Sequence, residues 1–269
     1  MTTPSLQEQM AVAQAYESLF VPALFAQWAP HVARIARVSR GQRVLDVACG
    51  TGALAREMGR QVGETGSVTG LDLIPGMVEV AKQIAPHIEF RHGAAEDLPF
   101  PDQTFDVVVS QFGLMFFPDR AQALREMIRV LRPGGRLAVA VWDSLDATPA
   151  IAAEVSLLDR MAGSAAANAL RAPFALGDPT ILEQLARDAE VADATVTTKP
   201  GTARFPSIRS LVEADLRGWL PVLGVVLEEE LIQSILAEAE RDLHQYVDAD
   251  GSAVFQISAH ILSGARSKE

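Results

Sequence analysis

The stretch VLDVACGTG, residues 44–52, decides the fold of this chain. A short apolar run that reads as a buried strand leads into a loop with two glycines, and residues 53–62 follow with helical spacing. Strand, glycine loop and helix in this order are typical of nucleotide-binding α/β folds. Asp46 lies inside the strand beside that loop, where its charge would repel a diphosphate.

The alternation of strands and helices continues as far as residue 142. Further strands are expected at 67–72, 88–92, 105–110 and 136–142, with helices at 75–85 and 119–131 and a turn at RPGG, 132–135. Strands rich in Val and Leu that alternate with helices predict parallel strands covered on both faces. The predicted fold class is a doubly wound, mostly parallel α/β sheet.

The two ends of the chain have a different pattern. Residues 8–38 read as helical, interrupted at Pro22 and Pro30, and after residue 142 the regular alternation stops. Helices are expected there at about 147–163, 178–190, 207–220 and 227–247, and strands at 194–199 and 253–264. We therefore divide the chain into a helical lid (1–38), an α/β core (39–145), late sheet elements with a helical cap (146–252), and a final edge strand with a tail (253–269).

Composition narrows the classes of function. The 269 residues include 23 basic and 34 acidic side chains, for a net charge of −11, which disfavours nucleic acid as a partner. The longest apolar runs, 137–142 and 220–227, are far shorter than the roughly 20 residues of a membrane span. The first ten residues lack a secretory signal, and one cysteine, Cys49, fits a reducing cytoplasm. Nothing in the sequence indicates an oligomeric state.

The choice of ligand depends on two acids. Asp72 ends the second strand, 20 residues after Gly52, the spacing of a carboxylate that binds ribose hydroxyls. This spacing, and Ala55 in the third position of a G-x-G-x-x-A pattern, suit both a nicotinamide dinucleotide and S-adenosylmethionine. Asp46 favours S-adenosylmethionine, which carries an ammonium and a sulfonium but no phosphate. The hypothesis is thus a loop for a nucleoside joined to an amino acid.

Four ordered motifs carry a family resemblance. VLDVACGTG, VTGLDLIPGMVEVA, GAAEDLPFPDQTFDVVVSQFGLMFFPD and VLRPGGRLAV resemble the class I S-adenosylmethionine-dependent methyltransferases, most of all the branch with the ubiquinone and menaquinone biosynthesis C-methyltransferases. The resemblance covers about residues 40–142. It implies a Rossmann-like sheet of seven strands with a last antiparallel strand, S-adenosylmethionine as cofactor, S-adenosylhomocysteine as product, and no metal.

The resemblance also implies roles for residues around the loop. The methionine part of the cofactor would be wrapped by Ala48, Cys49, Gly50, Thr51 and Gly52. Asp46 would face the ammonium, directly or through water. Asp72 would bind the ribose hydroxyls, and Leu73 and Met77 would flank the adenine or the ribose.

The adenine edge would meet the turn after the third strand, at Ala94, Ala95 and Glu96. Many relatives have an aspartate where this chain has Ala94, so either Glu96 or Asp97 substitutes for it or only a backbone amide reads the ring. Gln111 would face the transferred methyl group. Tyr16 either closes a lid over the methionine end or packs the leading helices on the sheet.

The methyl acceptor is expected to be a small, partly apolar molecule between the lid, the 111–118 loop and the cap, with FGLMFF (112–117) as apolar walls. Phe174, Phe205 and Trp219 are core or pocket residues. Methyl transfer to carbon or oxygen can need a base, and Glu213, Asp215 and His260 are candidates that the sequence does not rank, so no catalytic residue is assigned.

Two other functions stay open. One is a non-catalytic S-adenosylmethionine-binding or regulatory protein, because no base stands out. The other is a nicotinamide-dependent oxidoreductase, against which Asp46 argues. The five histidines show no metal-ligand spacing, and SQFG replaces the Asn/Asp-Pro-Pro-aromatic run of nucleotide-methylating enzymes after the fourth strand.

Overall fold

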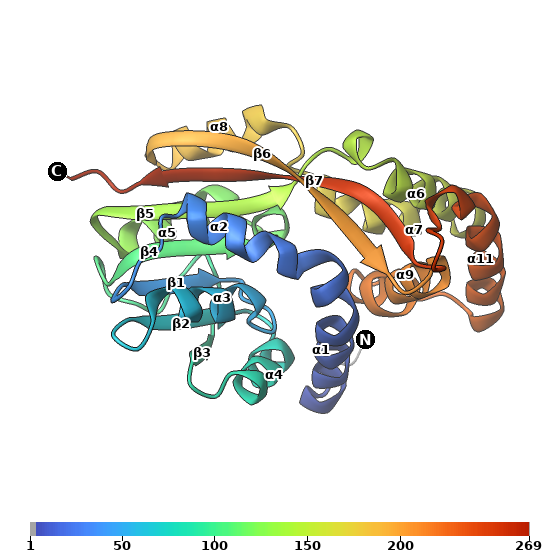
Figure 1. The fold of residues 1–269 in the computed structure, drawn as a ribbon, viewed down its shortest axis with the longest axis horizontal. Coiled ribbons are helices and arrows are strands. Elements are labelled where there is room, and N and C mark those ends of the chain that lie inside the picture. The colour runs from blue at the N-terminus through green and yellow to red at the C-terminus, as the bar shows by residue number, and fades with distance from the viewer. Residues whose placement is uncertain (1–3, 269) are drawn as a thin grey trace.

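The computed structural model describes residues 4–268, which form one seven-stranded sheet in the order β3-β2-β1-β4-β5-β7-β6 (Figure 1). The strands are β1 (Arg43–Val47), β2 (Ser67–Asp72), β3 (Glu89–His92), β4 (Phe105–Gln111), β5 (Leu131–Trp142), β6 (Ala192–Phe205) and β7 (Ala253–Ala265). Strands β1 to β5 are parallel, and β7 is antiparallel to β5 and β6. The predicted fold class is confirmed. Residues 1–3 and 269 of the expected lid and tail lie outside the described residues.

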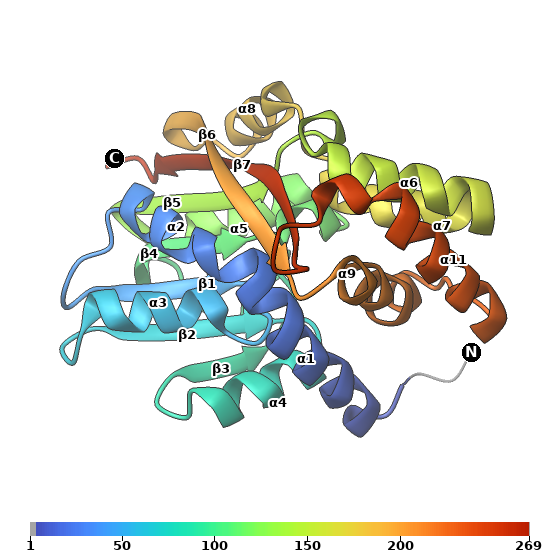
Figure 2. The same cartoon turned by 45° about the vertical axis from the view of Figure 1, so that its right-hand side comes forward.

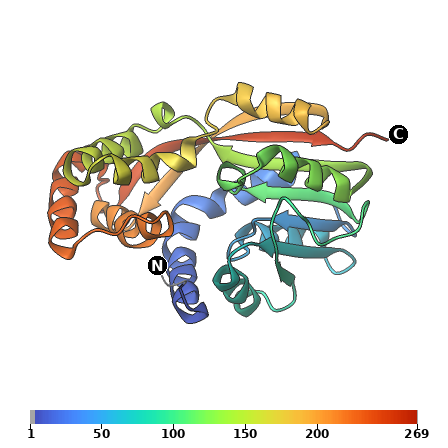
Figure 3. The same cartoon turned by 180° about the vertical axis from the view of Figure 1, so that it is seen from behind.

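Helices cover both faces of the parallel strands. On one face lie α2 (Ala29–Ile35) and α3 (Ala53–Val62), and on the other lies α5 (Arg120–Val130), as Figures 1 and 3 show. Two further helices, α4 (Pro75–Ile84) and α8 (Pro179–Asp188), pack against β2 and β3 and against β6 and β7, respectively. Strand β4 is buried from its first residue to its sixth. This double cover explains why the strands read as continuous apolar runs.

Two predictions about the sheet are wrong. Strand β7 is not the edge strand: it lies between β5 and β6, and its residues 259–264 are all buried, whereas β6 is largely exposed and forms the edge. The expected turn at RPGG, 132–135, lies within β5. There the strand accommodates the sequence through a register shift against β4, with Gly134 at a φ of +75°.

The lid is continuous but changes helix type. Helix α1 (Leu6–Phe20) passes into a π-helical turn (Val21–Phe25), a 3-10 turn (Ala26–Trp28) and then α2. Pro22 and Pro30 each lie in the first turn of a new segment, where a missing N–H is tolerated. The prolines therefore alter the helix without ending it.

The cap contains more helices than the sequence pattern indicated. They are α6 (Pro149–Ala162), α7 (Ser164–Arg171), α9 (Ile208–Ala214), a π-helical turn (Asp215–Trp219), α10 (Leu220–Val222) and α11 (Glu229–Asp242). Helix α7 was not predicted; Gly163, with a φ of +85°, separates it from α6. No helix within residues 4–268 has both the length and the apolar character that a bilayer span requires.

A two-stranded ribbon joins the cap to the sheet. Residues 259–265 of β7 run between β5 and β6, whereas residues 253–258 pair with residues 200–205 of β6 and not with β5. Beyond the end of β5 the two strands therefore run on together, toward the cap helices α6, α7, α9 and α11 (Figures 1 and 2). The ribbon holds the cap beyond the carboxyl ends of the parallel strands, the edge at which ligands bind in open α/β sheets.

Candidate functional site

The glycine loop between β1 and α3 has a tight backbone. Ala48, Gly50 and Gly52 all have positive φ, at 57°, 55° and 86°. A Cβ added to Gly52 would lie 2.9 Å from Cζ of Phe90, so both the conformation and the close packing require glycine there. The Cys49 N–H donates to the Leu71 carbonyl at 3.0 Å, which ties the loop to the end of β2. The loop is therefore tight and consists of small residues, of which Thr51 and Gly52 are buried.

Asp72 braces this loop from the end of β2. Its carboxylate accepts the backbone N–H of Gly50 and that of Ile74, each at 2.8 Å, and the side chain is 7% exposed. Burial raises the pKa of Asp72, and the two backbone hydrogen bonds oppose that change. Each carboxylate oxygen has a second lone pair, so the group can still accept from a ligand.

Asp46 is fully buried, and neither of its carboxylate oxygens has a hydrogen-bond partner among the described residues. Burial raises its pKa well above the usual range, and the charge of Asp72 raises it further. The backbone N–H of Ala55 lowers the pKa of Asp46 in part, although it does not have the geometry of a hydrogen bond to the carboxylate. Because an unpartnered buried carboxyl is costly, this position points to a ligand with a positive group.

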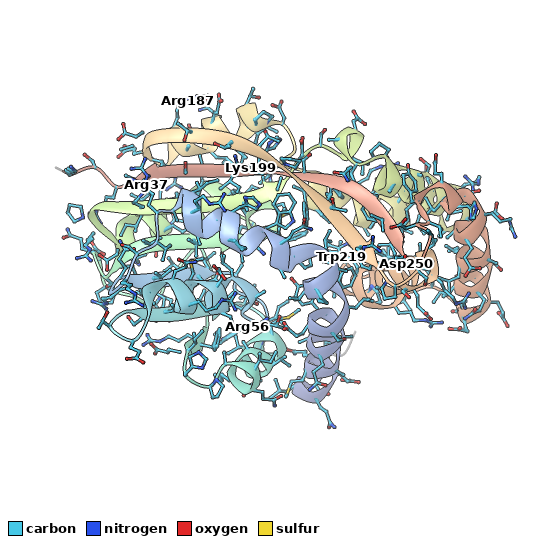
Figure 4. All side chains as sticks on the ribbon, in the orientation of Figure 1. Arg37, Arg56, Arg187, Lys199, Trp219 and Asp250 are labelled. Atoms are coloured by element: carbon cyan, nitrogen blue, oxygen red, sulfur yellow. The ribbon has the colours of Figure 1, made fainter. Side chains whose placement is uncertain are left out.

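The lid is held against the loop by polar contacts. Glu17 accepts from the Thr51 hydroxyl and pairs with Arg56 at 2.7 Å. Nearer the start of α1, the Gln9 side-chain oxygen accepts the Gly76 N–H at 3.2 Å. Arg56 is labelled in Figure 4, between the core and α1. These contacts close α1 over the ends of β1 and β2.

Tyr16 lies on the inner side of this lid. Its ring carbon Cε1 is 3.9 Å from where a Cβ on Gly50 would be. Burial raises the pKa of the Tyr16 hydroxyl, and the charges of Asp72, Glu17 and Asp46 raise it further. The ring also stacks on Phe25 at a centroid distance of 5.2 Å. Tyr16 therefore faces the carboxylates as well as packing the lid.

The residues predicted near the adenine surround the ends of β2 and β3. Leu73 is 60% exposed, unusual for a leucine, and Met77 is half-buried. Ala95 is buried and Ala94 half-buried. The Glu96 carboxylate accepts from the Asp119 N–H at a long 3.5 Å, which leaves its hydrogen-bonding capacity largely free.

Gln111 connects the core to the lid. Its side-chain amide donates to the Phe25 carbonyl at 3.2 Å, but its buried Oε1 has no partner among the described residues. Phe112, which follows, has a φ of 58°, a strained value for a bulky residue. From this residue the chain runs along the wall of a cavity, which Phe112 and Phe116 line.

This cavity, of about 150 Å³, lies between the lid and the cap. Apolar side chains from the lid, the loop after β4, the cap and the ribbon line it, among them Phe20, Leu24, Phe25, Phe116, Trp142, Phe174, Phe205, Trp219 and Phe255. Tyr16 and Phe112 complete the wall toward the glycine loop. Trp219 is labelled in Figure 4, between α1 and the cap. The cavity lies where the sequence placed the acceptor, and Phe174, Phe205 and Trp219 all line it.

The structure separates the three candidate bases. Glu213 pairs with Arg217 on the surface at 2.9 Å. His260 bonds to the Thr198 hydroxyl at 2.8 Å and the Gly177 carbonyl at 3.1 Å, away from the cavity. Asp215 lines the cavity and is 6% exposed.

Some residues of the site had no signal in the sequence. Gln9, Glu17 and Arg56 hold the lid closed, and Glu154 lies buried beside Asp215. Each makes a contact with a distant part of the chain, and none belongs to a motif. Among residues 4–268 no three His, Cys, Asp or Glu side chains are grouped to hold a metal ion.

Comparisons with known proteins agree with this geometry. Residues 45–139 match the family model described as a methyltransferase domain. The demethylmenaquinone methyltransferase of Listeria welshimeri is 43% identical over 120 residues, which are 43% of this chain and 51% of the relative. That of Staphylococcus epidermidis is 42% identical over 130 residues, 46% of this chain and 54% of the relative. The chain thus spans about half the length of the curated relatives that it matches.

Solved structures resemble nearly the whole chain. Phosphoethanolamine N-methyltransferase 2 of Haemonchus contortus, in complex with S-adenosyl-L-methionine, has a TM-score of 0.61 at 16% identity, over 98% of this chain and 60% of the other. The YcgJ protein of Bacillus subtilis has a TM-score of 0.57 at 20% identity, over 90% of this chain and 99% of the other. The predicted resemblance to class I methyltransferases, in sequence over the core and in fold over the chain, is confirmed.

Proposed function

We propose that this chain, which carries a methyltransferase domain over residues 45–139, transfers a methyl group from S-adenosylmethionine to a small, partly apolar molecule. The observation that carries the proposal is the buried Asp46 carboxyl without a partner among the described residues, beside a tight glycine loop in which Ala48, Gly50 and Gly52 have positive φ. An ammonium beside Asp46 would lower its pKa again and balance its charge. A diphosphate at this position would do neither.

The other residues of the site fit the same ligand. Asp72 would accept from the ribose hydroxyls with its free lone pairs, and the exposed Leu73 would cover one face of the nucleoside. Gln111, whose buried Oε1 lacks a partner, would accept from the methionine portion. Ala48 to Gly52, Met77, Ala94, Ala95 and Glu96 would line the remainder of the site.

Methyl transfer from a sulfonium is an in-line displacement, so the main task of the protein is to align two molecules and exclude water. We assign the donor to the core, residues 39–145, and the acceptor to the cavity between the lid and the cap, residues 146–252. Tyr16 separates the two and would close over the methionine end. With Cys49 as the single, buried cysteine, we propose a cytoplasmic enzyme.

The acceptor does not follow from the curated relatives, because the aligned part covers less than half of this chain and about half of each relative. The relatives named for demethylmenaquinone nevertheless place quinols first in a screen. The apolar cavity supports acceptors of that general character.

Two measurements test the proposal. Titration calorimetry with S-adenosylmethionine, S-adenosylhomocysteine and NAD is expected to show binding of the two sulfur compounds alone. Binding of NAD in their place would make the chain an oxidoreductase candidate. A screen of quinols, phenols and amines for uptake of a labelled methyl group is expected to find an acceptor. Cofactor binding without uptake by any class would identify a non-catalytic binding protein.

A further inference from the structure

Two carboxyl groups are buried on the cap side of the apolar cavity. Asp215 starts the π-helical turn that follows α9, and its side chain lines the cavity. Behind it lies Glu154 of α6, which is fully buried, and neither of its carboxyl oxygens meets a donor among the described residues. Apart from the Asp215 carboxyl and the Tyr16 hydroxyl, the side chains that line the cavity are aliphatic or aromatic. A polar pair in such surroundings needs a function or a compensating partner.

The partner of each carboxyl is the other. Burial raises the pKa of both groups, and the charge of Asp215 adds to the effect on Glu154. Two adjacent carboxyls without a cation cannot both ionise, so they share a proton. Glu154 is fully buried, whereas Asp215 borders the cavity, so the proton is better placed on Glu154 and the negative charge on Asp215.

The nearest charged residues do not neutralise the pair. Arg217, two residues after Asp215, forms ion pairs at the surface with Glu213 at 2.9 Å and with Glu229 at 2.8 Å. On the lid side of the cavity the titratable group is the Tyr16 hydroxyl, a weak acid. The Asp215 carboxylate can therefore accept a hydrogen bond from a donor group on a ligand that enters the cavity.

We propose that Asp215 takes the proton from an aromatic hydroxyl of the acceptor held in this cavity, while Glu154 orients Asp215 through their shared proton; the proposal rests on the methyltransferase function proposed above. Aromatic walls, with Phe112 stacked on Trp142 at 3.7 Å, suit a flat ring. An amine fits less well, because a carboxylate stabilises its ammonium form, which has no lone pair for attack.

The step balances without any further reagent. The hydroxyl oxygen forms a bond to the methyl carbon while the sulfur–carbon bond breaks, and that electron pair returns to sulfur. The hydroxyl proton goes to the Asp215 carboxylate. The positive sulfur and the negative carboxylate both become neutral, which is favourable in surroundings of low dielectric constant.

Binding of para-nitrophenol and of para-nitrotoluene, which differ by a hydroxyl in place of a methyl group, tests the proposal. Calorimetry is done on the full chain, with and without S-adenosylhomocysteine. The unaltered protein should prefer the phenol by about tenfold or more, as expected for a hydrogen bond to a charged acceptor. Asp215→Asn should abolish the preference. Glu154→Gln should retain the preference for the phenol. This variant loses the adjacent buried carboxyl but keeps a hydrogen-bond donor to Asp215.

The spectrum of bound para-nitrophenol tests the positioning role of Glu154. Without a donor Asp215 becomes a stronger base, so Glu154→Leu should shift the bound compound toward phenolate, and Glu154→Gln should not. Identical spectra for the two variants would overturn that role, since a merely structural glutamate would not move the proton.

Three results would overturn the role of Asp215: equal binding of both compounds by the unaltered protein, binding of neither, or a preference that survives in Asp215→Asn. Tighter binding of benzylamine than of the phenol would overturn the choice of acceptor. S-adenosylhomocysteine reports separately on the donor site: its failure to bind the unaltered chain would contradict the proposed function, while the phenol comparison without it still decides the role of Asp215.

Discussion

The α/β core and the cap both bury carboxyl groups, but these groups have different neighbours. In the core, Asp72 accepts two backbone N–H groups, and Asp46 lies beside it with none. In the cap, Glu154 is buried beside Asp215, which borders the largely apolar cavity. All four are at most 7% exposed.

The core and the cap differ in how the negative charge of a buried carboxyl is balanced. Backbone donors already favour the charged form of Asp72, so a cationic ligand completes the core site by balancing Asp46. Within residues 4–268 the Glu154 carboxyl has no such donor, and we infer that a proton shared between the two acids takes the place of the missing charge there. Carboxyl groups that are buried to a similar extent therefore suit the core for binding a cation and the cap for proton transfer.

The largest expected effect is on the core side of this comparison. Asp72→Ala should weaken S-adenosylmethionine binding by about 1–3 kcal/mol, because the ribose hydroxyls lose a charged acceptor. Asp106→Ala is the matched control: Asp106 is also 7% exposed and accepts a backbone N–H, from Arg43 at 2.7 Å, but lies near the start of β4. Calorimetry should find that Asp106→Ala binds S-adenosylmethionine with the affinity of the unaltered protein. Equal losses in both variants would mean that Asp72 acts only through the fold.

The next effect concerns the cap and its dependence on pH. A carboxyl with a raised folded pKa stabilises the fold while protonated, and this contribution is lost as pH rises through that pKa. Burial raises the pKa of Asp215 to about 7, so thermal unfolding of the unaltered protein should show decreasing stability from about pH 5 to about pH 7, with a slope of up to about 1.4 kcal/mol per pH unit for each proton. Asp215→Asn should remove about one proton's share of this slope.

Comparing the variant with the unaltered protein isolates the pair. His31 has a lowered pKa, which gives a slope of the opposite sign, but it contributes equally to both proteins. Acids with lowered pKa values, such as the buried Glu126 and the exposed Glu229, lose their contributions only at lower pH. Parallel curves for the two proteins over this range would show that Asp215 does not titrate there.

The smallest expected effect is at the lid, which joins the two halves. Glu17→Gln removes the ion pair with Arg56, whose side chains are 22% and 23% exposed, and should cost about 0.2–1 kcal/mol. Because the pair holds α1 closed, the loss should appear as faster dissociation of S-adenosylhomocysteine in stopped-flow measurements. Glu79→Gln, which breaks the surface pair with Lys82, is the control and should leave the rate unchanged. Equal rates in all three proteins would assign lid closure to apolar packing alone.

Local sequence determined the core of this protein. The run from Val44 to Gly52 and the helix after it form a strand, a loop and a helix because their signals lie within a few residues of one another. The position of Asp72 at the end of the next strand followed in the same way. Order along the chain was sufficient here, since parallel strands with helical crossovers place successive carboxyl ends at one edge.

Tertiary structure alone decided the rest. The sequence pattern of residues 253–264 indicated a strand, but the burial that places β7 inside the sheet depends on β6 beside it. The pairs Glu17–Arg56 and Glu154–Asp215 join segments far apart in the chain, and nothing in either segment specifies the other. Whether a buried acid meets a donor, a second acid or no partner depends on how distant elements pack, and that packing determines its charge and its chemistry.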